Sequence, residues 1–192
     1  MNKISVLGAG TFGISLARLL ANKGFEVTVY VHNETKAQLL RETRRHERFK
    51  DVLLPESIVY SSDLKEAFKD KEMIVYAIPS TSIREVASLS KEYVEDGQYI
   101  VDVAKGMEKD SLLTLTEVID DVYKNDTLKY VVLSGPTHAE EVIKDMPTAI
   151  VAASKDIEAA KVVQETFSVD FFRVYTNEDI RGIEICGALK NI

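Results

Sequence analysis

The chain has 192 residues, 45% of them hydrophobic and 29% charged, which is enough apolar material for one well-buried domain with a small appendage. Asp and Glu total 31 against 24 for Lys and Arg, and the net charge of −7 argues against a general attraction to nucleic acid or to an anionic membrane. With Cys186 as the only cysteine, no signal peptide and no long apolar span, the sequence predicts a cytoplasmic protein without a disulfide and without stable membrane insertion.

Short apolar runs rich in Val and Ile alternate with longer amphipathic segments along the chain. This alternation is typical of βαβ units, and it predicts an α/β fold with a doubly wound, mostly parallel sheet covered on both faces. A late strand at 171–175 is expected to pair at an edge of the sheet. The other predicted strands cover residues 3–7, 26–31, 73–78, 99–103, 130–134 and 148–153.

Helical periodicity accounts for most of the remaining sequence. The predicted helices cover residues 12–23, 34–46, 63–69, 81–93, 110–123, 138–144 and 156–167. Ser154 is expected to cap the last of these helices at its amino end. Between residues 41 and 57, a cluster of charges followed by a proline predicts a solvated helix end and a loop.

The stretch from Gly182 onward reads GIEICGALKNI and places a lysine in an apolar setting. At 3.6 residues per turn, one small, apolar face predicts a helix that packs closely on its neighbours. This face carries Ile180, Ile183, Cys186, Gly187 and Leu189. Cys186 is interpreted as core packing, because no histidine is near it in the sequence. Lys190 either extends its stem to solvent near the helix end or has a function there.

A glycine-rich loop, GAGTFG, follows the first predicted strand and precedes a helix rich in Ala and Leu. Gly8 permits a tight turn, Gly10 lets the backbone approach a pyrophosphate, and Gly13 allows the helix to pack close to the strand. The free N–H groups of Thr11, Phe12 and Gly13 would face the anion, with the helix dipole behind them. This motif between a strand and a helix predicts a dinucleotide site.

The carboxylate that usually binds a ribose 2′-hydroxyl at the end of the second strand is missing, since that strand ends in Tyr-Val-His-Asn and Glu34 arrives slightly late. His32 could lie against the adenine ribose or, if protonated, approach a 2′-phosphate. The position therefore does not choose between NAD and NADP.

The three histidines, His32, His46 and His138, are scattered along the chain and have no partners at metal-ligand spacing. The sequence therefore predicts no metal site. At least two of these histidines are expected to be surface or loop residues.

Further motifs follow the glycine loop in a fixed order: AIPS, DVAKGMEKD, SGPTHAEEVIKDMPTAIVAAS and GALKN. Together with GAGTFG they resemble the bacterial type of NAD(P)-dependent glycerol-3-phosphate dehydrogenase, over residues 3 to 192. The resemblance implies a Rossmann-like nucleotide-binding domain. It also implies reversible reduction of dihydroxyacetone phosphate to sn-glycerol 3-phosphate for phospholipid synthesis with NAD or NADP, and a homodimer for the full-length protein.

The resemblance also implies roles for individual residues. Thr11 and Phe12 match loop positions that touch the cofactor, and His32 stands where such enzymes often have an arginine beside the adenosine. Lys105 matches a lysine near both cofactor and substrate. Ala139 matches a cofactor contact.

On the substrate side, Gly135 and Thr137 match substrate-contacting positions, and Lys190 matches the lysine regarded as the proton donor and acceptor. Lys105 would stabilise charge beside the substrate oxygen that Lys190 protonates, or beside the substrate phosphate. Burial of Lys190 among small residues would lower its pKa toward the range useful for acid–base chemistry. The structural alternatives are a salt bridge from Lys105 to Asp102 or Glu108, and a solvent-directed Lys190.

The sequence departs from the family pattern in two places. The family continues into an all-helical second domain that supplies an aspartate and an Arg-Asn pair, whereas 179–192 corresponds only to the start of that domain after a nucleotide-binding domain at 1–178. We therefore expect a truncated chain that is inactive alone. The second departure is HERFKDVLLPES, where an Asn-x-x-Tyr-Leu-Pro pattern is more usual.

Other functions remain open. The chain could be a nucleotide-binding module without turnover, or part of a related two-domain reductase for a β-hydroxyacid or ketopantoate. The substrate loops of such a reductase should differ from SGPTHAEE.

Overall fold

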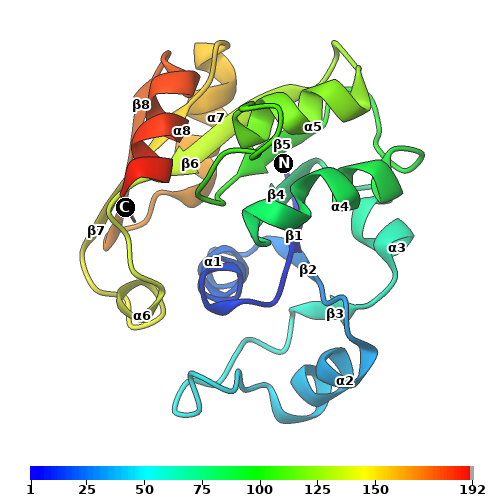
Figure 1. Ribbon diagram of the computed structural model, residues 1–192. Helices are drawn as coiled ribbons and strands as arrows, with labels where there is room; N and C mark the ends of the chain where they lie inside the picture. Colours follow the sequence, from blue (N-terminus) through cyan, green and yellow to red (C-terminus); the bar gives the residue numbers. More distant parts are fainter. Residues whose placement is uncertain (191–192) are drawn as a thin grey trace.

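The computed structural model describes residues 1–190, which form one eight-stranded sheet flanked by helices (Figure 1). The strand order is β3-β2-β1-β4-β5-β6-β7-β8. All neighbouring strands are parallel except β6 and β7, so the predicted mostly parallel sheet is confirmed. The strands are β1 (Lys3–Leu7), β2 (Glu26–Tyr30), β3 (Val59–Ser61), β4 (Met73–Tyr76), β5 (Tyr99–Asp102), β6 (Lys129–Ser134), β7 (Thr148–Ala153) and β8 (Phe172–Asn177).

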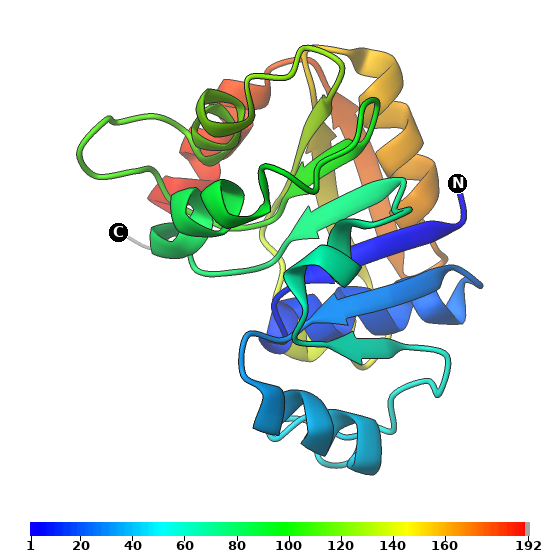
Figure 2. The same ribbon diagram turned by 90° about the vertical axis from the view of Figure 1, so that its right-hand side faces the viewer.

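Helices cover both faces of the sheet, as the two views in Figures 1 and 2 show. The helices are α1 (Thr11–Asn22), α2 (Glu34–Thr43), α3 (Leu64–Phe68), α4 (Ile83–Ser90), α5 (Leu115–Tyr123), α6 (Ala139–Val142), α7 (Ile157–Phe167) and α8 (Ile180–Leu189). A short 3-10 turn, Ser80–Ser82, precedes α4. One core lies under α1 and α7 and another under α3, α4 and α5, while α8 packs over β6 and β7.

The parallel strands are buried on both sides, which explains their nearly continuous apolar sequences. In β4, Met73, Ile74, Val75 and Tyr76 are all fully buried, and side chains on opposite faces enter different cores. The strand predicted to lie at an edge is β8, and this prediction is confirmed because β8 pairs only with β7 among the described strands.

Several predicted boundaries differ from the structure. The helix predicted to continue to residue 46 ends at Thr43, because Arg44 adopts a left-handed conformation with φ 52°. Ser154 is not the N-cap of α7: Asp156 is, with its carboxylate accepting from the N–H groups of Glu158 and Ala159. The hydroxyl of Ser154 instead donates to the carbonyl of Tyr130 and accepts from the N–H of Asp156.

Strand β3 was missing from the predicted elements. It contains Val59, Tyr60 and Ser61, too short a run to show strand periodicity. Its pairing with β2, including a bond from the Val31 N–H to the Ser61 carbonyl, places it at the edge opposite β8.

Candidate functional site

The glycine loop lies between the end of β1 and the start of α1, as predicted. A Cβ added to Gly8, which has φ +110°, would lie 2.5 Å from the carbonyl oxygen of Ala77, and one added to Gly13 would lie 2.3 Å from the Gly8 carbonyl oxygen. A Cβ on Gly10 would meet nothing within 4 Å. Gly8 and Gly13 are therefore required by packing, whereas Gly10 leaves open space beside the backbone.

The amino end of α1 is suited to bind an anion. Gly10 is its N-cap, so no side chain caps the helix, and its first turn contains no acidic residue. The positive end of the helix dipole and the first N–H groups therefore point toward the open space at Gly10. The side-chain-free approach and the uncapped N–H groups together fit the pyrophosphate of a dinucleotide.

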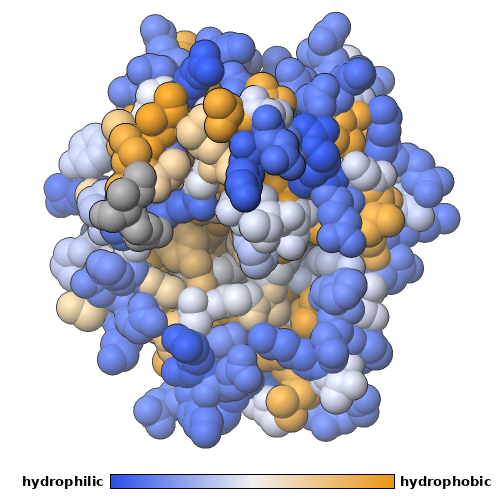
Figure 3. Space-filling model, viewed as in Figure 1, coloured by the Kyte–Doolittle hydropathy of each residue, from blue (hydrophilic) through white to orange (hydrophobic). Residues whose placement is uncertain are grey.

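This helix end opens into a cleft of about 450 Å³ at the carboxyl ends of β1, β4 and β5. Figure 3 shows the corresponding face hollowed near its centre. In an open parallel sheet, this edge is where ligands bind. The cleft is lined by Gly10, Thr11, Phe12, Gly13, Ala77, Ile78, Pro79, Val103, Ala104, Lys105, Thr137, His138, Ala139 and Glu140.

The structure thus brings most of the predicted site residues together in one cleft. Thr11, Phe12, Lys105, Thr137 and Ala139 contribute to the same lining, although they come from distant parts of the sequence. A concave lining with apolar side chains and a few polar groups is typical of a small-molecule site.

Two of the predicted residues, Gly135 and Lys190, lie instead in a smaller cavity of about 240 Å³ between α8 and the β6–β7 pair. A Cβ added to Gly187 would lie 2.6 Å from the Ser134 hydroxyl, so α8 approaches β6 closely at this point. The other lining residues are Ser134, Pro136, Val151, Ile183, Cys186 and Gly187.

Lys105 is the half-buried lysine of the cleft, and its Nζ lies 5.7 Å from the centroid of the Phe12 ring. Burial lowers the pKa of Lys105, the charge of Lys190 lowers it further, and Asp102 opposes both effects. Among the described residues Lys105 forms no ion pair, and Glu108 pairs with Arg84. The salt-bridge alternative for Lys105 is therefore not what the structure shows.

Asp102 lies at the end of β5, just before the segment that carries Lys105. Its Oδ1 accepts from the N–H of Ala104 at 3.1 Å, while its Oδ2 is buried with no hydrogen-bond partner in the described part of the chain. Burial raises the pKa of Asp102 well above its usual range. The aspartate thus shapes the turn that presents Lys105.

The burial expected for Lys190 is wrong, because this residue is exposed at the C-cap of α8. Cys186 is also exposed, which contradicts its interpretation as core packing. Leu189 has 57% of its surface exposed. The close contact of α8 is confined to the side that carries Ile180 and Gly187, and the rest of its apolar face is uncovered, as the apolar surface over α8 in Figure 3 shows.

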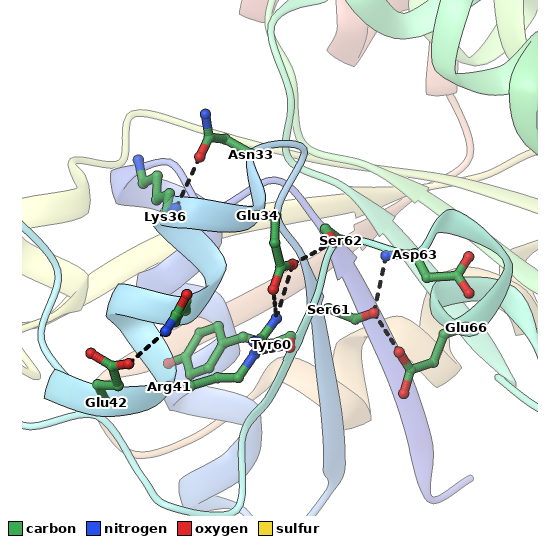
Figure 4. A network of polar contacts seen from close by, with 11 residues as sticks. Asn33, Glu34, Lys36, Arg41, Glu42, Tyr60, Ser61, Ser62, Asp63 and Glu66 are labelled. Atoms are coloured by element: carbon green, nitrogen blue, oxygen red, sulfur yellow. Dashed lines mark hydrogen bonds and ion pairs between the residues drawn. The ribbon is translucent and has the colours of Figure 1, made fainter.

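The other end of the site lies past β2, where His32 is exposed and lines neither cavity. Glu34 is present there, but both of its carboxylate oxygens accept from Nη2 of Arg41, at 2.9 and 3.0 Å (Figure 4). Ser62 donates to the same carboxylate, and this bond, followed by Arg41, lowers the pKa of Glu34. The charge of Glu34 is thus balanced within the network, which Asn33 flanks as the N-cap of α2.

His46 is a structural part of the site that the sequence did not indicate. Its side chain is buried, and its Nε2 lies 3.2 Å from the carbonyl oxygen of Ala9 in the glycine loop. Burial, followed by the charge of Lys36, lowers the pKa of His46. The prediction that at least two histidines lie at the surface is confirmed by His32 and His138.

Glu184 joins α8 to α5. Its carboxylate accepts from the N–H and the hydroxyl of Thr116, at 2.9 and 2.7 Å, and only 5% of the residue is exposed. Burial raises the pKa of Glu184. These bonds hold the middle of α8 against α5 and therefore help to set its position on β6 and β7.

We expect Glu184→Ala to destabilise the fold, because it leaves two buried donors of Thr116 without an acceptor. The expected loss is about 2–4 kcal/mol in the free energy of unfolding, or roughly 5–15 °C in Tm for a domain of this size. Thermal melting of this variant beside Glu178→Ala, an exposed residue in the loop before α8, checks this. Equal Tm values for the two variants would show that the Glu184 bonds contribute nothing.

A larger cavity, of about 550 Å³, lies elsewhere, between α5, β6 and the start of α8. Its lining mixes cations with carboxylates and includes none of the predicted site residues. It therefore does not compete with the cleft at the carboxyl edge. Within residues 1–190, no helix combines the length and apolarity needed to cross a bilayer.

The sheet order, the glycine loop and the uncapped α1 define a dinucleotide-binding domain of the Rossmann class. Residues 3–160 match the model of the NAD-dependent glycerol-3-phosphate dehydrogenase N-terminus. The chain belongs to this family.

Individual relatives agree with the family assignment. The chain is 49% identical to glycerol-3-phosphate dehydrogenase (NAD(P)+) 2 of Lactobacillus delbrueckii, with 100% of the chain and 58% of the relative covered. It is 41% identical to the enzyme of Thermoanaerobacter, covering 99% of the chain and 57% of the relative. The crystal structure of glycerol-3-phosphate dehydrogenase from Coxiella burnetii superposes with a TM-score of 0.93 at 31% identity, covering 99% of the chain and 58% of that structure. The chain therefore spans little more than half the length of these relatives.

Proposed function

We propose that this chain is the coenzyme-binding part of a glycerol-3-phosphate dehydrogenase that uses NAD or NADP. In this proposal the whole protein catalyses the reversible reduction of dihydroxyacetone phosphate to sn-glycerol 3-phosphate. The observation that supports it most is the cleft in which the glycine loop, Lys105 and Ala139 share one lining. The relatives' names supply the substrate class.

In this proposal the coenzyme would lie along the cleft and extend past it toward His32. The N–H groups at the start of α1 would hold the pyrophosphate, and His32 would lie toward the adenosine. Phe12 and Ala139 would border the part of the coenzyme nearest Lys105. When bound, the nicotinamide supplies the hydride acceptor or donor, and the protein supplies position and charge.

The two lysines would act on the substrate oxygen at C2. Lys190 would give a proton to the developing alkoxide during reduction and take it back during oxidation. Lys105 would hold a positive charge beside that oxygen or the phosphate, with Gly135 and Thr137 offering backbone contacts.

The exposure of Lys190 supports a further part of the proposal, that these 192 residues alone bind coenzyme without turnover. An exposed lysine is not held against a carbonyl, and bulk water reaches it. The experiment is a fluorescence titration of this chain with NADH and NADPH, followed by an assay with dihydroxyacetone phosphate. We expect measurable binding and negligible rates. Turnover comparable to that of the full reading frame would contradict this part of the proposal.

The substrate itself is tested with the full reading frame. We expect dihydroxyacetone phosphate to be reduced, with ketopantoate and β-hydroxyacid substrates left unreacted. A preference for either of those would assign the protein to another two-domain reductase. Supply of sn-glycerol 3-phosphate for phospholipids, a cytoplasmic location and a homodimer are the corresponding expectations for the whole protein.

A further inference from the structure

The segment that carries Lys105 is a compact loop between β5 and α5. Met107 and Thr114 form an antiparallel bridge across it. The N–H of Glu108 donates to the carbonyl of Leu113, and the N–H of Leu112 donates to the carbonyl of Glu108, both at 3.0 Å. Glu108 thus sits at the base of the loop, three residues after Lys105.

Arg84, in the first turn of α4, forms a bidentate ion pair with Glu108. Its Nε and Nη2 donate to the two carboxylate oxygens at 2.7 and 2.9 Å, and its Nη1 donates to Asp121 of α5 at 2.7 Å. The hydroxyl of Ser111 also donates to Glu108. The bonds from Arg84 and Ser111 lower the pKa of Glu108 to about 2, so the carboxylate stays charged at any working pH.

This pair joins two walls of the cleft. Arg84 follows the β4–α4 segment, in which Ile78 and Pro79 line the cleft together with Lys105. A second contact lies beside it, because a Cβ added to Gly106, which has φ +145°, would be 3.0 Å from the Cβ and the hydroxyl of Ser80. The Lys105 loop is thus bonded to α4 through Arg84, and at Gly106 it lies close to the Ser80 side chain in the 3-10 turn before α4.

We propose that Arg84 is a positioning residue which, through Glu108, holds the Lys105 loop so that the Lys105 ammonium stays over the ring of Phe12 and faces the cleft. The inference rests on the proposed function for the identity of the reaction. Its geometric part rests only on the contacts of Arg84, Glu108 and Lys105.

Loss of the Arg84–Glu108 pair should change the reaction rate more than the free energy of unfolding. The Arg84 and Glu108 side chains are 39% and 24% exposed, so solvent screening limits what this pair contributes to the free energy of unfolding, although its two parallel bonds make it stronger than a single-contact surface pair. A loop that shifts a charged group by about 1 Å can cost roughly a hundredfold in rate. The variants should therefore fold normally and lose activity.

The test uses the full-length protein with Arg84→Gln, Glu108→Gln and the double variant. Lys129→Gln is the matched control: it removes an exposed ion pair to Asp156, 3.3 Å long, at the amino end of β6, away from the cleft. We expect kcat for dihydroxyacetone phosphate to fall roughly ten- to a hundredfold in both single variants, with Tm equal to that of the control. The double variant should lose no more kcat than either single variant, because each single substitution already breaks the Arg84–Glu108 ion pair.

A spectroscopic measurement gives a readout that does not depend on turnover. In wild-type protein, NMR of reductively methylated lysines should show the pKa of Lys105 below its ordinary value, with Lys190 and Asp102 as the charged neighbours that affect it. Release of the loop in Arg84→Gln should expose Lys105 and raise this pKa, and Arg84→Lys should restore it only in part, since it cannot form the same forked bonds.

An unchanged Lys105 pKa together with an unchanged kcat in Arg84→Gln would overturn the inference. A loss of kcat in Arg84→Gln accompanied by a Tm clearly below that of the Lys129→Gln control would assign Arg84 a structural role. That result would also overturn the inference. If the proposed function is wrong, the results differ from these. Wild-type protein would then fail to reduce dihydroxyacetone phosphate, while the pKa of Lys105 would still change in Arg84→Gln.

Discussion

Gly10→Ala is expected to weaken coenzyme binding while leaving the fold intact. Gly10 has φ −75°, which alanine adopts readily, and the added Cβ would meet nothing within 4 Å in the protein. The methyl group would occupy the space through which a pyrophosphate reaches the N–H groups of α1. Loss of one charge-assisted hydrogen bond costs about 1.5–3 kcal/mol, so the Kd for NADH should rise roughly 10- to 150-fold.

The measurement is an NADH titration beside a melting curve. Gly13→Ala is the contrasting variant, because its Cβ would lie 2.3 Å from the Gly8 carbonyl oxygen and 3.1 Å from the Ala77 side chain, so it should lower Tm strongly. An unchanged Kd in a folded Gly10→Ala protein would remove the dinucleotide site from this loop. A collapse of Tm in Gly10→Ala would show that the open space beside Gly10 is misassigned.

In the full-length background, Lys190→Ala should lower kcat by roughly two to four orders of magnitude, the usual contribution of a positioned proton donor. Coenzyme Kd should stay nearly unchanged, because Lys190 lines the smaller cavity and not the cleft. Lys190→Arg should rescue little, since guanidinium keeps its proton and has a different shape. Steady-state rates and NADH titrations of both variants provide the check.

The pH profile reports on the charge interaction between the two lysines, whereas kcat decides whether Lys190 transfers the proton. The charge of Lys190 is one cause of the lowered pKa of Lys105, so Lys190→Ala should raise the pKa of Lys105. Any alkaline limb governed by Lys105 should then move to higher pH. Near-normal kcat in both variants would return Lys190 to a solvent-directed side chain whose replacement changes stability only modestly.

The sequence was most informative where the relevant interactions are local. The GAGTFG loop, the strand before it and the helix after it need only the spacing of glycines and apolar residues, and all appear in the structure. The buried strand β4 was found for the same reason. Strand β3 was missed because its pairing with β2, a contact with a distant segment, is what makes it a strand.

In the site, too, the sequence did not predict features that depend on contacts between distant segments. Helical periodicity placed Ile183, Cys186 and Gly187 on one face but could not say which part of that face would be covered; only the Gly187 side approaches β6 closely, while Cys186 and Lys190 are exposed. Likewise, His46 lies in a charged stretch that looks solvated, and its burial against Ala9 depends on how the chain folds back after Arg44. The boundary predicted between 178 and 179 stays a prediction.

Amide NMR shifts of the ¹⁵N-labelled chain, recorded during titration with NADH, show whether the cleft at the carboxyl edge of the sheet is the coenzyme site. We expect the largest changes at Thr11, Phe12, Gly13 and Lys105, which surround the cleft. Changes confined to Thr116, Glu117 and Tyr130, around the larger cavity between α5 and β6, would contradict it.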